Sequence, residues 1–236
     1  MLDLTEIEAR TSSELIEWAL ATFGDHFAIA TAFQKSGMVV VDLAARTGRP
    51  FRVFTLDTGR LPEETLRMAD RVRARYGVTV ERVTPDPAEV AAMVQEHGPD
   101  LFYDGVEFRR LCCDVRKVRP LTRKLRELDA WATGLRRDQA ETRATVPKIT
   151  DVDGRIKINP LADWTSAEVD EYIRLHDIPV HPLYDRGYRS IGCAPCTRAV
   201  EPGEEERAGR WWWERESKKE CGIHFTADGA VRRTTL

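Results

Sequence analysis

Hydrophobic and polar positions along the first part of the chain alternate between two periodicities. Apolar residues recur at helical spacing over residues 4–21, and the short apolar run over 27–33 is too brief and too rich in β-formers to be a second helix. The same order then repeats as a helix over 38–46, a strand over 51–56, a helix over 62–77 and a strand over 78–83. This pattern predicts consecutive βαβ units.

Two further helices and a strand extend the pattern. A helix begins near Pro87, a long basic helix covers about 108–128 with a break at Pro120, and a strand covers 131–135. Four strands separated by helices predict an α/β fold with a doubly wound, mostly parallel sheet. Ligands bind such sheets outside the carboxyl ends of the strands. We expect three polar loops to converge there: 34–37, 57–60 and 136–143.

The last third of the chain is less regular. After an apolar run at 156–158, Thr165 and Glu168 form a capping box that begins an amphipathic helix ending near His176. Proline- and glycine-punctuated loops follow, and then a charge-dense run around three consecutive tryptophans, Trp211, Trp212 and Trp213. One helix cannot turn all three toward the core, so we expect at least one to contact solvent or a partner.

The domain organisation follows from this change of pattern and from the chain length. A chain of 236 residues with 42% hydrophobic and 32% charged residues is long enough for one sizeable core. We expect one α/β domain over residues 1–200 and a C-terminal tail over 201–236 that folds onto it.

Charge and hydropathy limit the partners of the protein. The net charge of −3 gives no general electrostatic basis for nucleic-acid binding. No apolar run approaches the roughly 18 residues that span a bilayer, and the acidic amino terminus lacks the features of a secretory signal. We therefore expect a cytoplasmic protein with neither nucleic acid nor membrane as a partner, and a homo-oligomer is compatible with the sequence.

Four of the five cysteines form two pairs that suggest a metal site. Cys112 and Cys113 are adjacent, and Cys193 and Cys196 belong to a Cys-Ala-Pro-Cys motif about eighty residues later. Adjacent residues on a helix diverge by about 100°, which suits a cuboidal iron-sulfur cluster better than one zinc ion. Structural zinc and buried inert thiols remain the alternatives.

The segment around the first cysteine pair is strongly basic. Residues 109–126 contain eight Lys or Arg and a single acidic residue, Asp114. Four thiolates around an oxidised 4Fe-4S core leave a net negative charge, which such a helix would balance. The alternative interpretation is an ordinary solvated helix face.

The fifth cysteine, Cys221, stands apart near the end of the chain. Lys218, Lys219 and His224 favour its thiolate, while Glu220 opposes it. A nucleophilic thiol is one interpretation of this setting, and an incidental exposed thiol is the other.

Motifs along nearly the whole chain resemble those of the thioredoxin-dependent adenylyl-sulfate (APS) reductases of assimilatory sulfate reduction. The matching motifs are Thr31-Ala32-Phe33-Gln34-Lys35-Ser36-Gly37-Met38, Leu56-Asp57-Thr58-Gly59-Arg60, Cys112-Cys113, Gly134-Leu135-Arg136-Arg137-Asp138-Gln139, Cys193-Ala194-Pro195-Cys196 and Glu220-Cys221-Gly222-Ile223-His224.

The resemblance implies a fold, a cofactor and a set of site residues. The fold would be the adenine-nucleotide α-hydrolase type shared with the ATP pyrophosphatases, and the cofactor a 4Fe-4S cluster on the four paired cysteines. The segment around Thr31, Phe33 and Gly37 would lie against the nucleotide, with Leu56, Asp57 and Thr58 facing the adenosine. The sulfate and phosphate groups would bind to four basic residues: Lys117, Arg136, Arg207 and Arg210.

The resemblance also implies an oxidoreductase of sulfate assimilation and cysteine biosynthesis. The Cys221 thiolate would attack the sulfur of APS to give AMP and an S-sulfocysteine, His224 would help to keep the thiol ionised, and thioredoxin would release sulfite. The tail would then have to move between a closed and an exposed position. A reductase that prefers the 3′-phosphorylated substrate PAPS or uses both substrates is one alternative. A non-catalytic nucleotide sensor with a cluster or zinc is another.

Overall fold

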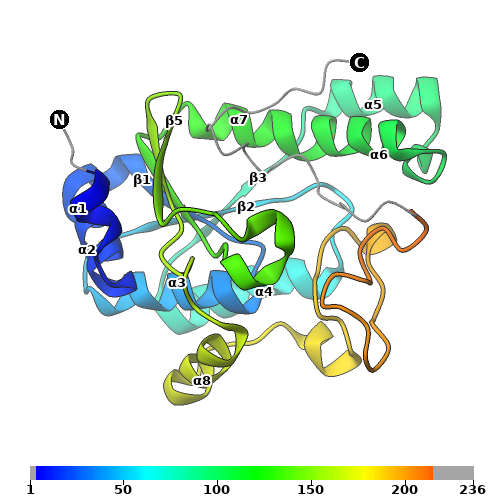
Figure 1. Cartoon of the computed structure of the whole chain (residues 1–236). Coiled ribbons are helices and arrows are strands. Elements are labelled where there is room, and N and C mark those ends of the chain that lie inside the picture. Colours follow the sequence, from blue (N-terminus) through cyan, green and yellow to red (C-terminus); the bar gives the residue numbers. More distant parts are fainter. Residues whose placement is uncertain (1–3, 215–236) are drawn as a thin grey trace.

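A six-stranded sheet forms the centre of the protein in a computed structural model that describes residues 4–214 (Figure 1). The strands are β1 (Phe27–Ala30), β2 (Arg52–Leu56), β3 (Val80–Val83), β4 (Ala130–Thr133), β5 (Ile149–Val152) and β6 (Arg155–Ile158). Their order is β3-β2-β1-β4-β6-β5, and every neighbouring pair is parallel except β5 and β6. The predicted doubly wound, mostly parallel sheet is confirmed.

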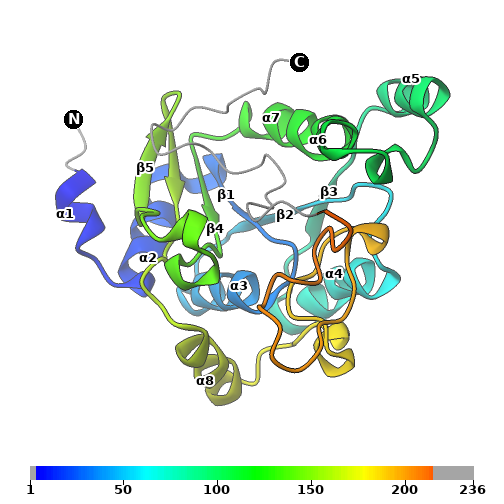
Figure 2. The ribbon, with the colours of Figure 1, turned by 45° about the vertical axis from the view of Figure 1, so that its right-hand side comes forward.

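Helices cover both faces of this sheet. They are α1 (Leu4–Glu8), α2 (Ser12–Phe23), α3 (Lys35–Arg46), α4 (Glu63–Tyr76), α5 (Pro87–His97), α6 (Val106–Cys113), α7 (Arg119–Leu125) and α8 (Ser166–His176). Figures 1 and 2 show α3, α4 and α8 on one side and α6 and α7 on the other. The sequence between the strands therefore forms the crossover helices that a parallel sheet requires.

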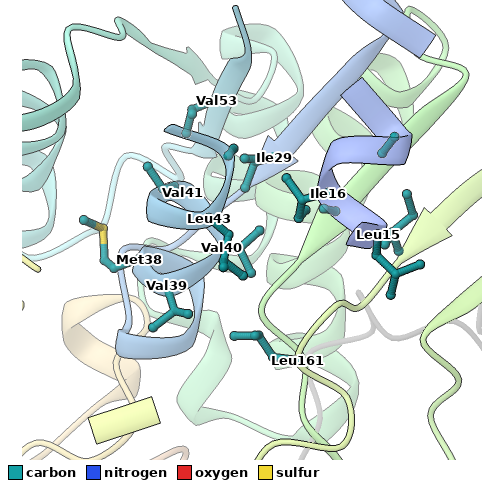
Figure 3. Close-up of a cluster of buried hydrophobic side chains, with 14 of the residues drawn as sticks. Leu15, Ile16, Ile29, Met38, Val39, Val40, Val41, Leu43, Val53 and Leu161 are labelled. Atoms are coloured by element: carbon teal, nitrogen blue, oxygen red, sulfur yellow. The ribbon is translucent and has the colours of Figure 1, made fainter. Parts of the chain in front are cut away.

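The larger hydrophobic core lies between the sheet and α2 and α3. Ile16 of α2, Ile29 of β1 and Val40 of α3 are fully buried there, and Figure 3 shows their side chains gathered in one cluster. On the opposite face, Trp131 of β4 packs with Leu121 of α7 in a smaller core. Burial on both faces explains why the central strands consist of nearly uninterrupted apolar residues.

The amino-terminal helix predicted over residues 4–21 is wrong as a single helix. It is divided into α1 and α2, because Thr11 begins a new helix there. The Thr11 side chain accepts a hydrogen bond from the Glu14 backbone N–H, and the Glu14 carboxylate accepts one from the Thr11 backbone N–H at 2.8 Å. This capping box satisfies backbone groups that would otherwise be unpaired.

The predicted break at Pro120 is also wrong. The helix continues from α6 through a π-helical segment, Asp114–Val118, into α7, where Pro120 lies in the first turn. Pro120 directly follows the wider π turn, in which the Arg119 N–H bonds to the Asp114 carbonyl five residues back, and the helix passes the proline without ending. Wider π turns inside α-helices are frequent at functional sites.

Strand β5 is absent from the sequence prediction. It forms a two-residue hairpin with β6, and the turn residues Asp153 and Gly154 both have positive φ angles. Asp-Gly between two short strands is a known hairpin signal, so this element could have been found.

The predicted capping box at Thr165 is confirmed at the start of α8. Of the three tryptophans, Trp211 is buried and Trp212 is 40% exposed, as the sequence predicted for at least one of them. In the part of the chain that the structure describes, no helix is long and apolar enough to cross a membrane.

Candidate active site

A cavity of about 270 Å³ lies at the carboxyl ends of the central strands. Strand β1 has β2 on one side and β4 on the other, so the chain reverses its direction of winding between β1 and β4. Such a switch point opens a crevice where open α/β sheets bind ligands. The cavity wall includes residues that follow β1, β2 and β4, as the sequence predicted for the three loops.

Two glycines allow the backbones on either side of the switch point to approach closely. A Cβ atom at Gly134 would lie 2.6 Å from the backbone N of Gly37, and one at Gly37 would lie 2.5 Å from the Thr31 hydroxyl. A larger residue at Gly134 would force the β4 loop away from the start of α3, and one at Gly37 would collide with Thr31 after β1. Thr31 and Gly37, both predicted site residues, line the cavity.

Apolar side chains form the floor of the cavity. Phe54 of β2, Leu121 of α7 and Trp131 of β4 line it from the face of the sheet that α7 covers. Leu56 and Thr58, predicted to face the adenosine, line the wall after β2. A flat apolar surface beside backbone and hydroxyl groups suits a purine base and its sugar.

Basic residues dominate the polar lining of the cavity. Five basic side chains contribute to it: Lys117, Arg143, Lys157, Arg207 and Arg210. Glu206 is the one acidic residue among the described lining residues. Arginine forks and lysine ammonium groups in this number suit a ligand with several anionic oxygens.

Three of the predicted substrate residues lie outside the lining. Phe33 is buried in the core at a positive φ of 57°, and its backbone N–H donates to the Thr31 hydroxyl at 2.9 Å. Asp57 accepts a hydrogen bond from the Gly59 N–H at 3.0 Å. Arg136 donates to Asp138 at 2.9 Å and to the Ser36 hydroxyl. Arg136 therefore contacts the first turn of α3 at Ser36, and Phe33 belongs to the core.

The four paired cysteines converge on a second, smaller cavity beside the first. Cys112 and Cys113 end α6, Cys193 precedes a 3₁₀ turn, Ala194–Cys196, and Cys196 ends that turn. All four thiols are buried. Among the described residues, no three His, Cys, Asp or Glu side chains are grouped closely enough to bind a single metal ion. The four cysteines nevertheless come from two distant parts of the chain to one cavity.

The surroundings of the thiols differ. Burial raises the pKa of Cys196 to about 12, and neighbouring Cys193 adds to the rise. Burial acts in the same direction on Cys193, but Lys117, the Thr58 hydroxyl and Arg210 together hold its pKa below the ordinary value. Thr58 Oγ1 lies 3.3 Å from Cys193 Sγ. Of these two thiols, Cys193 is the one whose surroundings favour the thiolate.

Cationic side chains surround the cysteine cavity. Arg60, Arg109, Arg116 and Lys117 line it, and no carboxylate does so within residues 4–214. Four thiolates would be strongly destabilised in a buried cavity without such charges. The donor set and its charge therefore fit a polynuclear, anionic iron-sulfur group of the predicted kind.

Two other positive charges of the basic helix have carboxylate partners. Lys124 pairs with Glu81 and Glu127, each at 2.7 Å, and Arg119 pairs with Asp114 at 2.8 Å. The far end of this segment therefore forms ion pairs, although Lys124 itself is buried rather than solvated. Three basic residues nearer the start of the segment, Arg109, Arg116 and Lys117, line the cysteine cavity instead.

Lys117 lines both cavities. It is buried, lies in the π-helical segment Asp114–Val118, and donates a hydrogen bond to the Cys193 thiol. The π turn places this residue four positions after Cys113 at the boundary between the thiols and the strand ends. One ammonium group can therefore act on both sites.

Comparisons with known proteins agree with this arrangement. Residues 26–199 match the family model described as "Phosphoadenosine phosphosulfate reductase domain". The chain belongs to this family. It is 46% identical over 224 residues to the "Adenosine 5'-phosphosulfate reductase" of Burkholderia cepacia. This alignment covers 93% of this chain and 90% of the relative. A protein with the same description from Allochromatium vinosum is 50% identical over 202 residues, or 85% and 79% of the two chains.

A solved structure of the family also resembles the chain. The phosphoadenylyl-sulfate (PAPS) reductase from Candida auris, in a phosphate complex, aligns with a TM-score of 0.69 and 30% identity. The alignment covers 85% of this chain and 98% of that one. The fold of the PAPS reductase family thus extends over nearly all of the described residues.

Sequence reasoning missed two basic residues in this PAPS reductase family site. Arg143 is buried, lines the nucleotide-sized cavity and donates to Gln139 at 2.6 Å. Lys157 is buried in β6, and burial lowers its pKa to about 8, with Arg143 adding to the effect. The sequence feature that could have revealed Lys157 is a lysine between the apolar Ile156 and Ile158. The feature that could have revealed Arg143 is its position at the end of the loop 136–143, which was expected at the strand ends.

Two further predicted residues cannot be placed. Cys221 and His224, the expected nucleophile and its partner, lie outside the described residues. The described part of the expected tail, 201–214, includes Arg207 and Arg210, which line the large cavity.

Proposed function

We propose that this protein reduces adenosine 5′-phosphosulfate (APS) to sulfite and AMP in sulfate assimilation. The observation that carries the proposal is the position of Lys117 in the walls of both the cationic strand-end cavity and the four-cysteine cavity. The relatives from Burkholderia cepacia and Allochromatium vinosum are both described as adenosine 5′-phosphosulfate reductases. Their descriptions favour APS over PAPS as the substrate.

In this proposal the adenosine lies on the apolar floor and the phosphosulfate faces the basic residues. Lys117, Arg143, Arg207 and Arg210 would contact the anionic oxygens, because these side chains line one cavity and carry the matching charge. Their main contribution is to stabilise the charge that develops on the AMP phosphate as the sulfur–oxygen bond breaks.

The chemical step needs a thiolate nucleophile, for which we propose Cys221. Its sulfur forms a bond to the APS sulfur while the bond to the phosphate oxygen breaks, which gives AMP and an S-sulfocysteine. A dithiol protein of the thioredoxin type then attacks Cys221 Sγ, sulfite leaves with the bonding electron pair, and the second thiol of the reductant restores the Cys221 thiol. His224 would hold Cys221 as thiolate.

Residues 201–236 would act as a tail whose first part, with the buried Trp211 and Glu214, stays on the domain. The part that carries Cys221 would close over the cavity for the first step and expose Cys221 for the second. Residues 1–200 would form the nucleotide-binding domain. Arg207 and Arg210 contact the cavity from this segment, which supports a role of the tail in substrate binding.

We further propose that Cys112, Cys113, Cys193 and Cys196 hold a 4Fe-4S cluster. When bound, the cluster would supply negative charge and a rigid link between the end of α6 and the Cys193 loop, since the dithiol protein supplies both electrons. Lys117 and Thr58, both in contact with Cys193, would then be fixed toward the substrate.

Intact-protein mass spectrometry tests this function directly. Anaerobically purified protein is exposed once to APS and separately to PAPS, with no thioredoxin present. We expect a stoichiometric sulfonate on Cys221 that forms faster from APS, and no adduct in Cys221→Ser, which should keep its iron. In Cys193→Ser, we expect loss of iron and of visible absorbance.

Other results would change the proposal. Faster labelling by PAPS would retain the chemistry and reassign the substrate. No adduct from either compound in iron-loaded protein would contradict sulfur transfer and favour a nucleotide sensor.

A further inference from the structure

An aromatic patch lies on the outer surface of the cysteine cavity. Three large hydrophobic side chains are exposed among the described residues, Tyr103, Trp212 and Leu175. The first two belong to one aromatic cluster, because both contact the ring of Trp213, at centroid distances of 4.5 and 4.8 Å. Tyr103 is 45% exposed and Trp212 is 40% exposed.

The patch is built on the wall of the cysteine cavity. Phe102, which lines that cavity, packs against Tyr103 at 4.6 Å and against Trp213 at 6.1 Å. The Tyr103 hydroxyl donates to the carbonyl of Pro195, between Cys193 and Cys196, at 3.1 Å. These contacts hold the exposed rings in fixed positions, and rigid exposed aromatic residues are typical of protein interfaces.

The position of the patch relative to Cys221 identifies the partner that would need it. Glu214, the last described residue, is buried, and Trp212 precedes it by two positions. Cys221 follows Glu214 by seven positions, and a chain extends by at most about 3.5 Å per residue. Cys221 is therefore always within roughly 25 Å of this anchor. A protein that attacks a sulfonated Cys221 therefore has to approach to within roughly 25 Å of Glu214.

We propose that the patch of Tyr103, Trp212 and Trp213 is the docking surface for the dithiol protein that reduces sulfonated Cys221. This inference rests on the proposed function. Contact with the patch would bring the reductant beside the anchored end of the chain segment that carries the substrate sulfur. The first half-reaction, sulfonation of Cys221 by APS, does not involve this surface.

The test compares two reductants in the same variant. Trp212→Ala removes an exposed ring without touching either cavity lining, so iron content and sulfonation by APS should match the unmodified protein. We expect the KM for reduced thioredoxin to rise on the order of tenfold, as for a central aromatic interface residue. Turnover with dithiothreitol, a small dithiol that needs no docking surface, should be unchanged. Leu175→Ala, which removes the exposed residue on α8 (60% exposed), is the matched control and should change neither.

Measuring thioredoxin binding directly separates the proposed docking surface from the proposed sulfonation of Cys221. Calorimetric titration with reduced thioredoxin should show weaker binding to Trp212→Ala and Tyr103→Ser than to the unmodified protein, whether or not APS sulfonates Cys221. Equal KM and equal affinity in all variants would overturn the docking surface while leaving the sulfonation result intact. Dissociation of a dimer by Trp212→Ala, seen by light scattering without any change in thioredoxin affinity, would assign the patch to a second copy of the chain and also overturn it.

Discussion

Arg109 and Glu214, 105 positions apart in the sequence, form a buried ion pair with two hydrogen bonds. Arg109 Nε donates to one carboxylate oxygen at 2.6 Å and a terminal nitrogen donates to the other at 3.1 Å. The Arg109 guanidinium also lies 4.6 Å from the ring centroid of Trp211. Since α6 carries Cys112 and Cys113, this pair fastens the last described residues to the helix of the first cysteine pair.

Breaking this pair should destabilise the fold. Glu214→Gln leaves a buried guanidinium without its counter-charge, and we expect the free energy of unfolding to fall by about 3–5 kcal/mol in anaerobic denaturant titrations of the iron-loaded protein. The double variant Arg109→Met with Glu214→Leu should lose less, because no charge stays unpaired. Glu171→Gln, in the exposed pair with Arg174, should leave the Tm unchanged. An equal small loss in all three would show that the pair is not structural.

Lys117 should affect the chemical step rather than the iron site. We expect Lys117→Ala to slow single-turnover sulfonation of Cys221 by roughly 10²–10³-fold, because it removes a charge aimed at the developing oxyanion. Iron content should remain that of the unmodified protein. The control is Arg126→Ala, an exposed position of the same basic segment. An unchanged sulfonation rate in Lys117→Ala would refute the proposed role.

Lys157 should make stability rise with pH. Its pKa falls from 10.5 in the unfolded chain to about 8 in the folded one. Between pH 8 and 10.5 the unfolded state therefore binds more protons, and the free energy of unfolding increases with pH in this window. Below pH 8 both states are protonated and the full cost of burying the charge remains, on the order of 3 kcal/mol. Lys157→Met should be more stable than the unmodified protein at pH 7, and the difference should shrink by pH 10.5 in urea titrations.

The same substitution should weaken nucleotide binding. Lys157 lines the cavity, and an anionic ligand favours its charged form. We expect the Kd of AMP for Lys157→Met to rise about tenfold, and the affinity of the unmodified protein to fall as pH rises through 8. Calorimetry at pH 7 and 9 measures both effects. Equal AMP affinity for the two proteins at pH 7 would place the lysine outside the binding site.

Gly134 should be required for the shape of the nucleotide cavity. A Cβ there would meet the backbone of Ser36 and Gly37 within 2.7 Å, so Gly134→Ala must displace the start of α3. We expect a loss of about 1–3 kcal/mol in stability together with weaker AMP binding. Gly48→Ala, at a positive φ of 68° in open space, should reduce stability without changing AMP affinity. The proposal fails if both variants bind AMP normally.

The sequence by itself determined the layers of the fold and indicated that its paired cysteines belong to one site. Apolar runs of strand length between amphipathic helices define a parallel sheet, because each periodicity fits only one element. The paired cysteines and the nearby positive charges could be assigned to one site, since their types and spacing carry that chemistry. Thr31, Gly37, Leu56 and Thr58, expected to lie near the nucleotide, line the cavity at the strand ends.

Only the tertiary structure decided which basic residues face the cavity. Arg136 and Arg143 lie in the same loop, yet Arg143 lines the cavity and Arg136 turns toward Ser36 and Asp138. Lys157 enters from β6, whose neighbour in the sheet is β4, a pairing between segments more than twenty residues apart. Local sequence fixes the backbone periodicity, whereas the direction of a long charged side chain depends on packing between distant segments, and no local pattern encodes that.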